Sequence, residues 1–213
     1  LSLPILAFIS LPLIALFLRT SLASLLANLQ EPQVLQAILL SLATSLTATL
    51  ITVVLGTPLA YALARNAFHY HRLIDTLIDL PIVLPPAVAG VALLVAFGRR
   101  GLFGGALSSL GVDIAFTTLA VILAQVFIAA PFYIKAAKLG FAAIDWELEQ
   151  AAGLDGANPW QVFRFVIVPL AWASLLGGSV MTWARAMGEF GATIIFAGNF
   201  PGRTQTMPLA IYL

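Results

Sequence analysis

"QVLQAILLSLATSLTATLITVVLGTPLAYALA", residues 33–64, contains no charged side chain. A helix needs about 20 apolar residues to cross the hydrocarbon core of a bilayer, so this run is long enough to span a membrane with some tilt. Small and hydroxyl-bearing residues recur along it at steps of three and four, at Ser41, Ser45, Thr49, Thr52 and Gly56. Because such a stripe lets helix backbones approach closely in lipid, we expect this face to pack against other helices.

The composition extends this character to the whole chain. Of the 213 residues, 61% are hydrophobic and only 9% are charged, whereas soluble domains carry roughly 25% charged residues. The mean hydropathy is +1.03. The chain contains no cysteine, which excludes disulfides and thiolate metal sites. The composition predicts an all-α integral protein of the cell membrane, with several membrane passes.

Four further apolar runs predict four more membrane spans, at residues 1–18, 73–97, 114–137 and 169–197. The first of them could instead be the apolar core of a signal peptide. No basic residue precedes it, and Pro4 and Pro12 fit such a core poorly, so a membrane helix is favoured. We therefore expect about five spans.

Prolines interrupt the run at residues 73–97 within "LPIVLPPAV", which contains Pro81, Pro85 and Pro86. Each proline lacks a backbone donor and disfavours helix in the residue before it. Broken helices at membrane depth are tolerated only where they face protein or a water-filled cavity. We therefore expect Pro85 and Pro86 to lie on the interior of the bundle.

The run at residues 169–197 carries two charged residues, Arg185 and Glu189, inside apolar sequence. They are four residues apart and share a helix face, and a helical rise of about 1.5 Å per residue places both in the outer half of the span. Gly188 and Gly191 flank the glutamate, which permits a bend and a close approach of another backbone. Two interpretations stay open: a structural ion pair and part of a gate.

A polar segment, residues 145–160, separates the last two runs. If the first helix enters from the cytoplasm, five Lys and Arg residues of the loops lie on the cytoplasmic side and four on the outer side. This weak bias places the segment in the cytoplasm. Asp145 is a possible N-cap, residues 146–154 favour a short helix and Gly156 suits its C-terminus. Asn158 and Pro159 then predict a second helix start. A short helix with an almost bare alanine face could be held by another protein or could be an ordinary solvated loop.

The segment "QAAGLDGANPWQVFRFVIVP" resembles the EAA signature of ABC-importer permeases, which reads Glu-Ala-Ala, three residues, Gly, nine residues and Ile-x-Leu-Pro. Gln150 replaces the glutamate, with Glu149 beside it, and valines replace the isoleucine and the leucine. The resemblance implies a type I importer helix bundle in which this segment is the coupling helix, seated in a cleft of an ATP-hydrolysing subunit. The coupling residues that it implies are Glu149, Gln150, Ala151, Ala152, Gly156 and Ala157.

Two further stretches, "LPIVLPPAVAGVALLVAFGRRGLFG" and "RAMGEFGATIIFAGNFPGRTQTMPLAIY", look like the corresponding segments of molybdate and tungstate permeases. Sulfate permeases share "GEFGA" and "AGN". The resemblance covers residues 31–213, which we expect to form the transmembrane domain, after an N-terminal helix and outer loop at 1–30. The family has one more span after this point, so the last span is expected to be missing. The broken helix and the charged pair described above lead us to expect the transport pathway and its gate at Pro85, Pro86, Arg185, Gly188, Glu189 and Gly191.

The expected function is that of a non-enzymatic permease subunit that moves molybdate or tungstate inward. No G-x-x-x-x-G-K-[ST] phosphate loop occurs in the sequence, so a separate subunit must hydrolyse ATP. The implied partners are two ATP-binding subunits, a periplasmic or extracellular oxyanion-binding protein, a second copy of the chain and the lipid bilayer. No nucleic acid, cofactor, metal or catalytic residue is expected. The alternatives are a sulfate or thiosulfate permease and, more remotely, an ion-coupled secondary anion transporter relying on Glu189.

Overall fold

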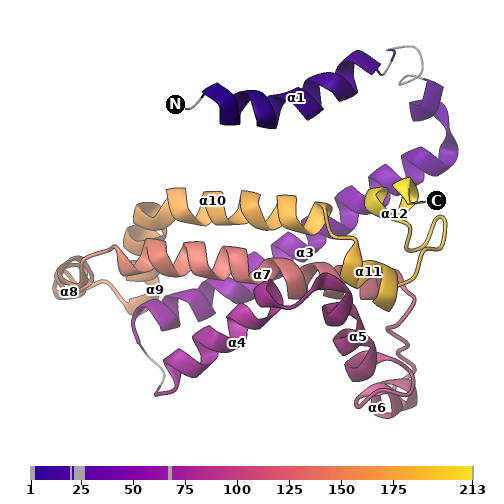
Figure 1. The fold of residues 1–213 in the computed structure, drawn as a ribbon. Coiled ribbons are helices and arrows are strands. Elements are labelled where there is room, and N and C mark those ends of the chain that lie inside the picture. Colours follow the sequence, from indigo (N-terminus) through magenta and orange to yellow (C-terminus); the bar gives the residue numbers. More distant parts are fainter. Residues whose placement is uncertain (1–2, 20, 22–26, 67–68, 213) are drawn as a thin grey trace.

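The computed structural model describes residues 3–19, 21, 27–66 and 69–212, and these residues form helices joined by turns. Three long helices pack against one another as the centre of the fold: α3 (Pro32–Ala64), α7 (Thr118–Ala142) and α10 (Val168–Met187) (Figure 1). The other elements are α1 (Leu3–Arg19), α4 (His71–Val83), α5 (Pro86–Phe97), α6 (Gly104–Ser109), α8 (Trp146–Leu154), α9 (Pro159–Val162), the π-helical turn η1 (Phe163–Ile167), α11 (Gly191–Phe196) and α12 (Met207–Ile211).

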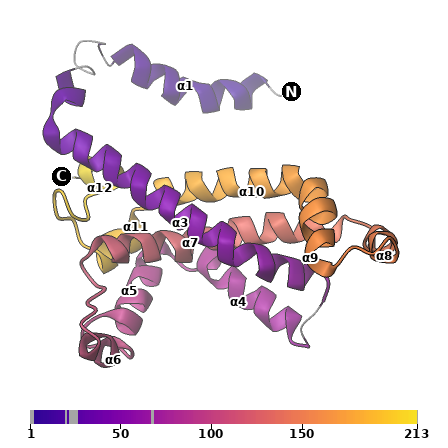
Figure 2. The ribbon, with the colours of Figure 1, turned by 180° about the vertical axis from the view of Figure 1, so that it is seen from behind.

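The helices confirm the all-α expectation but give a lower span count. Within the described residues, three helices are long and apolar enough to cross a membrane: Pro32–Ala64, Thr118–Ala142 and Pro159–Met187. The pair α4 and α5 makes a fourth candidate if it counts as one span, bent by 116° at its break. The remaining expected span, at residues 1–18, corresponds to α1, which has 17 residues, none of them buried. Figures 1 and 2 show it lying apart from the central helices.

The small-residue stripe of α3 is the packing face that the sequence predicts. Ser41, Ser45, Thr52 and Gly56 are all buried, and a Cβ on Gly56 would lie 3.1 Å from side-chain atoms of α7. The hydroxyl groups also form hydrogen bonds between elements. Trp183 Nε1 of α10 donates to Ser45 Oγ at 3.1 Å, and the first backbone N–H of α12 donates to Ser41 Oγ at 2.7 Å.

Two adjacent glycines of α10 allow a matched test of this close packing. A Cβ on buried Gly178 would lie 2.9 Å from Ala136 Cβ of α7, whereas one on exposed Gly177 would meet no atom within 4 Å. We expect Gly178→Ala to lower the free energy of unfolding by about 1–3 kcal/mol, because the extra methyl group overpacks the α7–α10 contact. Gly177→Ala should leave stability unchanged or raise it, since alanine favours helix. Thermal unfolding in detergent measures both, and equal effects would contradict the packing argument.

The fourth span is shifted from its expected bounds of 114–137. Helix α7 runs from Thr118 to Ala142, and Pro131 lies inside it without ending it. Lys135 and Lys138 lie within the helix, beyond Pro131. Each forms an ion pair with α4, Lys135 with Asp79 and Lys138 with Asp75. These pairs explain how the last turns of α7 carry two charges.

The fifth span, expected at 169–197, starts and ends earlier. The helix begins at Pro159, continues through η1 and ends at Met187. In η1 the N–H of Val168 donates to the carbonyl of Phe163, and this wider turn precedes Pro169, which has no N–H to donate. The helix therefore starts ten residues earlier than the proline suggested, while Gly191–Phe196 forms a separate helix, α11.

Candidate functional site

The expected coupling segment forms the short helix that the sequence predicts. Helix α8 spans Trp146–Leu154 and lies at one end of the bundle (Figure 1). Gly156 adopts φ +92°, its N–H donates to Gly153 O and the N–H of Ala157 donates to Ala152 O, each at 3.1 Å. This pattern is the Schellman motif, which closes a helix with a left-handed residue. The predicted C-terminus at Gly156 is confirmed.

The return helix also starts as predicted. Asn158 Oδ1 accepts from the N–H of Gln161 at 3.0 Å, and Gln161 Oε1 accepts from the N–H of Asn158 at 2.8 Å. This reciprocal pair is a capping box, and Pro159 occupies the first turn. Asp145, by contrast, sits at the N-cap of α8 without a side-chain hydrogen bond to its first turn. The turn between α8 and α9 is thus defined on both sides by local hydrogen bonds.

The residues expected to couple to an ATPase divide between two faces of α8. Gln150, Ala151 and Gly156 are exposed. Ala152 and Ala157 are partly buried and pack against the apolar core formed by α3, α7 and the start of α10. The bare alanine face of the prediction is therefore split, with Ala151 facing outward and Ala152 inward.

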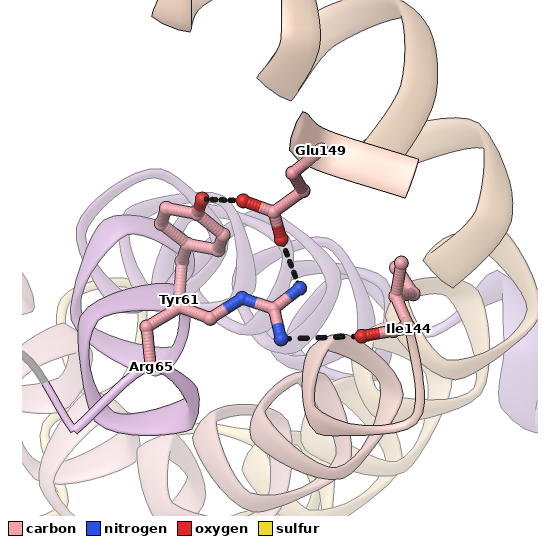
Figure 3. Close-up of polar contacts among 4 residues, drawn as sticks. All are labelled: Tyr61, Arg65, Ile144 and Glu149. Atoms are coloured by element: carbon pink, nitrogen blue, oxygen red, sulfur yellow. Dashed lines mark hydrogen bonds and ion pairs between the residues drawn. The ribbon is translucent and has the colours of Figure 1, made fainter. Parts of the chain in front are cut away.

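Glu149 points inward, toward α3. Its carboxylate accepts a hydrogen bond from Tyr61 Oη at 2.9 Å and forms an ion pair with Arg65 (Figure 3). Neither Tyr61 nor Arg65 was predicted as a site residue. Arg65 was counted only as a basic residue of the loop after the run at 33–64. The sequence has no signal that links position 65 to position 149.

A groove of about 330 Å³ lies beside this contact, between α8, α9 and the end of α3. Its walls include Tyr61, Trp146, Gln150, Gly153, Pro159 and Val162. Leu154 projects from the end of α8 with 90% of its surface exposed. This end of the molecule therefore exposes apolar side chains and a short helix.

The second candidate site brings together two helix breaks that are distant in the sequence. The α4–α5 break falls at Leu84 and Pro85, and α5 starts at Pro86. A Cβ on Gly191 would lie 2.6 Å from Pro86 Cβ, so α11 meets α5 through that glycine. Gly90 serves the same crossing, because a Cβ there would lie 2.8 Å from the carbonyl oxygen of Ala192. Pro85 and Pro86 were expected on the interior of the bundle, but both are exposed in the single chain.

Arg185 and Glu189 form the ion pair expected from their spacing, with Arg185 Nη1 2.7 Å from Glu189 Oε2. The side chain of Glu189 is only 1% exposed, against 31% for Arg185. Glu189 Oε1 also accepts from the N–H of Ala192 at 2.8 Å, which links the end of α10 to the first turn of α11. Gly188 lies between the two helices, at a bend that the glycines flanking Glu189 permit.

Comparison with known proteins gives a consistent result. The family described as "Binding-protein-dependent transport system inner membrane component" matches residues 53–212. The "Molybdenum transport system permease protein ModB" of Mycobacterium tuberculosis is 42% identical over 206 residues, which cover 97% of this chain and 78% of that protein. The protein of the same name from Escherichia coli is 42% identical over 178 residues, which cover 83% of this chain and 78% of that protein. The "Molybdate/tungstate transport system permease protein WtpB" of Thermococcus kodakarensis is 35% identical over 210 residues, covering 98% and 79%.

Proposed function

Because this chain belongs to the inner membrane components of binding-protein-dependent transport systems, we propose that it carries molybdate or tungstate into the cytoplasm. It is a permease subunit of an ABC transporter, a non-catalytic component of the membrane. The strongest support for the substrate is 42% identity, over 97% of the chain, to a relative named as a molybdenum permease. The relative named for both molybdate and tungstate supports the wider pair of oxyanions.

The proposed docking site for an ATP-hydrolysing subunit is the exposed face of α8. Three observations support it: α8 stands at the end of the bundle, Ala151 is exposed on it beside larger exposed side chains such as Leu148 and Leu154, and a groove lies beside it. Two such subunits would serve a pair of permease chains, and a binding protein would deliver the anion at the opposite face. The energy for transport then comes from the partner, since the sequence contains no phosphate loop.

The proposed pathway runs along the two helix breaks, between two copies of the chain in a type I importer arrangement. Residues 31–213 would form the transmembrane domain of each copy, and α1 would add a membrane helix to it. The exposure of Pro85 and Pro86 in the single chain supports a surface that faces a cavity or a second copy. Beside them, Arg185, Gly188, Glu189 and Gly191 would form the gate.

Uptake of radiolabelled molybdate tests the proposed function directly. The chain is expressed with its ATPase and binding-protein partners in cells that lack their own molybdate uptake. We expect uptake that requires an ATPase able to hydrolyse ATP and that tungstate inhibits more strongly than sulfate. Uptake that persists with a hydrolysis-deficient ATPase but collapses with the ion gradient would contradict the proposal, and stronger inhibition by sulfate would reassign the substrate.

Single cysteines test the pathway, since the chain has none of its own. Ala87 on α5 and Ala184 on α10 lie near the two breaks and are exposed in the single chain. In the assembled transporter we expect Ala87→Cys and Ala184→Cys to react with a water-soluble maleimide, and their rates to change when nucleotide binds. Leu50→Cys on the exposed side of α3 is the lipid-facing control. Rates equal to that control, with no nucleotide effect, would contradict the pathway assignment.

A further inference from the structure

Arg65 joins three separate parts of the fold at the cytoplasmic end proposed above. It follows the last residue of α3, and its side chain is only 15% exposed. One guanidinium nitrogen pairs with Glu149 of α8, while Nη1 donates to the carbonyl of Ile144, in the turn after α7, at 3.2 Å (Figure 3). Arg65 therefore connects the end of α3 with the end of α7 and with α8.

Aromatic rings and a second hydrogen bond hold this arrangement in place. The Arg65 guanidinium carbon lies 5.8 Å from the ring centroid of Tyr61 and 5.8 Å from that of Trp146. Tyr61, one turn earlier on α3, donates to the second carboxylate oxygen of Glu149 at 2.9 Å. Both oxygens of Glu149 thus bind α3, and the side chain is only 10% exposed. We call Tyr61, Arg65 and Glu149 the α3–α8 clamp.

Apart from the clamp, α8 is held by Ala152, which packs against the apolar core, and by contacts with α9 and η1. It has nine residues, too few to be stable alone, and none of these nine, all of which the structure describes, is fully buried. The chain connects α8 to α7 on one side and to α9 on the other, but not to α3. A buried ion pair with additional hydrogen bonds is expensive to break, because separation leaves a charge away from water. Separating α3 from α8 would therefore leave Arg65 and Glu149 as unpaired charges, both largely shielded from water.

We propose that the α3–α8 clamp transmits movement of the docked segment to α3, so that Tyr61 and Arg65 are positioning residues for transport. This inference rests on the proposed docking of an ATPase subunit on α8. Helix α3 could pass the movement on, since its buried face packs against α7 and its Ser45 accepts from Trp183 of α10. Movement of α8 would then reach α10, and the gate at its end, from two sides: through the chain and through α3.

The first test compares Arg65→Gln with Arg164→Gln, an exposed arginine of η1 at the same end. For Arg65→Gln we expect the ATPase subunit still to co-purify and hydrolyse ATP, while molybdate uptake per ATP falls about tenfold, the size of a typical coupling between sites. Arg164→Gln should match the unaltered chain. Tyr61→Phe removes one hydroxyl group without leaving a charge unpaired, so it tests the clamp even if Arg65→Gln folds poorly, and we expect a smaller fall in the same direction.

The second test measures the distance between α8 and α3 directly. Spin labels are placed on cysteines at Leu154 and Leu55, both exposed, in the complex with the ATPase subunit. With the clamp intact, we expect one label distance with and without nucleotide, because the two helices move together. With Arg65→Gln, the distance should shift on nucleotide binding.

Either of two results would overturn the inference. One is normal uptake per ATP in both Arg65→Gln and Tyr61→Phe. The other is a label distance that shifts with nucleotide as much in the unaltered clamp as in Arg65→Gln, which would leave the three residues a purely local structural role. Failure of the ATPase subunit to co-purify with the unaltered chain is a distinct result, and it would overturn the docking proposal together with this inference.

Discussion

Gly156→Val is expected to abolish transport while leaving membrane insertion intact. Gly156 closes α8 with φ +92°, and a left-handed conformation costs an ordinary residue about 1–2 kcal/mol. Valine is a genuine outlier there because of its branched Cβ. A Cβ at this position would meet no atom within 4 Å, so the expected effect comes from the backbone and not from a clash. The end of α8 should then unwind or turn away from the docking position.

Two variants separate this cause from a simple change of surface. Gly156→Asn should keep most of the uptake, because asparagine tolerates the left-handed region better than other residues with a side chain. Gly153→Ala, in α8 and equally open to solvent, should transport normally. Molybdate uptake and ATP hydrolysis are measured at matched expression. Normal uptake by Gly156→Val would contradict the docking proposal, and equal loss in Gly156→Asn would contradict the backbone explanation.

The second large effect is expected at Arg185 and Glu189. Arg185→Gln leaves the buried carboxylate of Glu189 without its cation, and breaking a buried pair costs about 3–5 kcal/mol. Because Arg185 is 31% exposed, water partly screens the pair. We therefore expect Arg185→Gln to lower the free energy of unfolding by about 2–3 kcal/mol, toward the low end of the cost of a buried pair. Glu189→Gln should lower the free energy of unfolding by less. The glutamine amide oxygen can still accept the hydrogen bond that the N–H of Ala192 donates to Glu189 at 2.8 Å.

The double variant decides whether the pair is a tether or part of a gate. We expect Arg185→Gln with Glu189→Gln to be less unstable than the sum of the single changes, because no unpaired charge remains. The position of the pair, where α11 crosses α5 at Gly191 and Pro86, leads us to expect that the two changes are also non-additive in uptake, by more than stability explains. Coupling in thermal stability alone would leave only a structural tether, and additive effects in both measurements would show that the side chains do not interact.

The sequence by itself determined the local features of this protein. Uncharged length predicts the membrane helix at 33–64, which the structure places at Pro32–Ala64, and its small-residue face is buried as expected. Helix α8 and the start of α9 were predictable because their signals lie within a few residues: the glycine at position 156, and Asn158 with Pro159. The double proline predicts the break between α4 and α5 for the same reason.

Only the tertiary structure decided which distant residues meet. Glu149 turns inward and pairs with Arg65, and Lys135, inside α7, pairs with Asp79 of α4. The end of the long helix at Met187 depends on the contact of Gly191 with Pro86 and on the hydrogen bond from Ala192 to Glu189. In each case the partner is on another helix, or the preference of the local sequence is balanced between helix and bend. Apolar length sets where a helix can form, but the pairing of buried charges and the close approach of two backbones set where it ends.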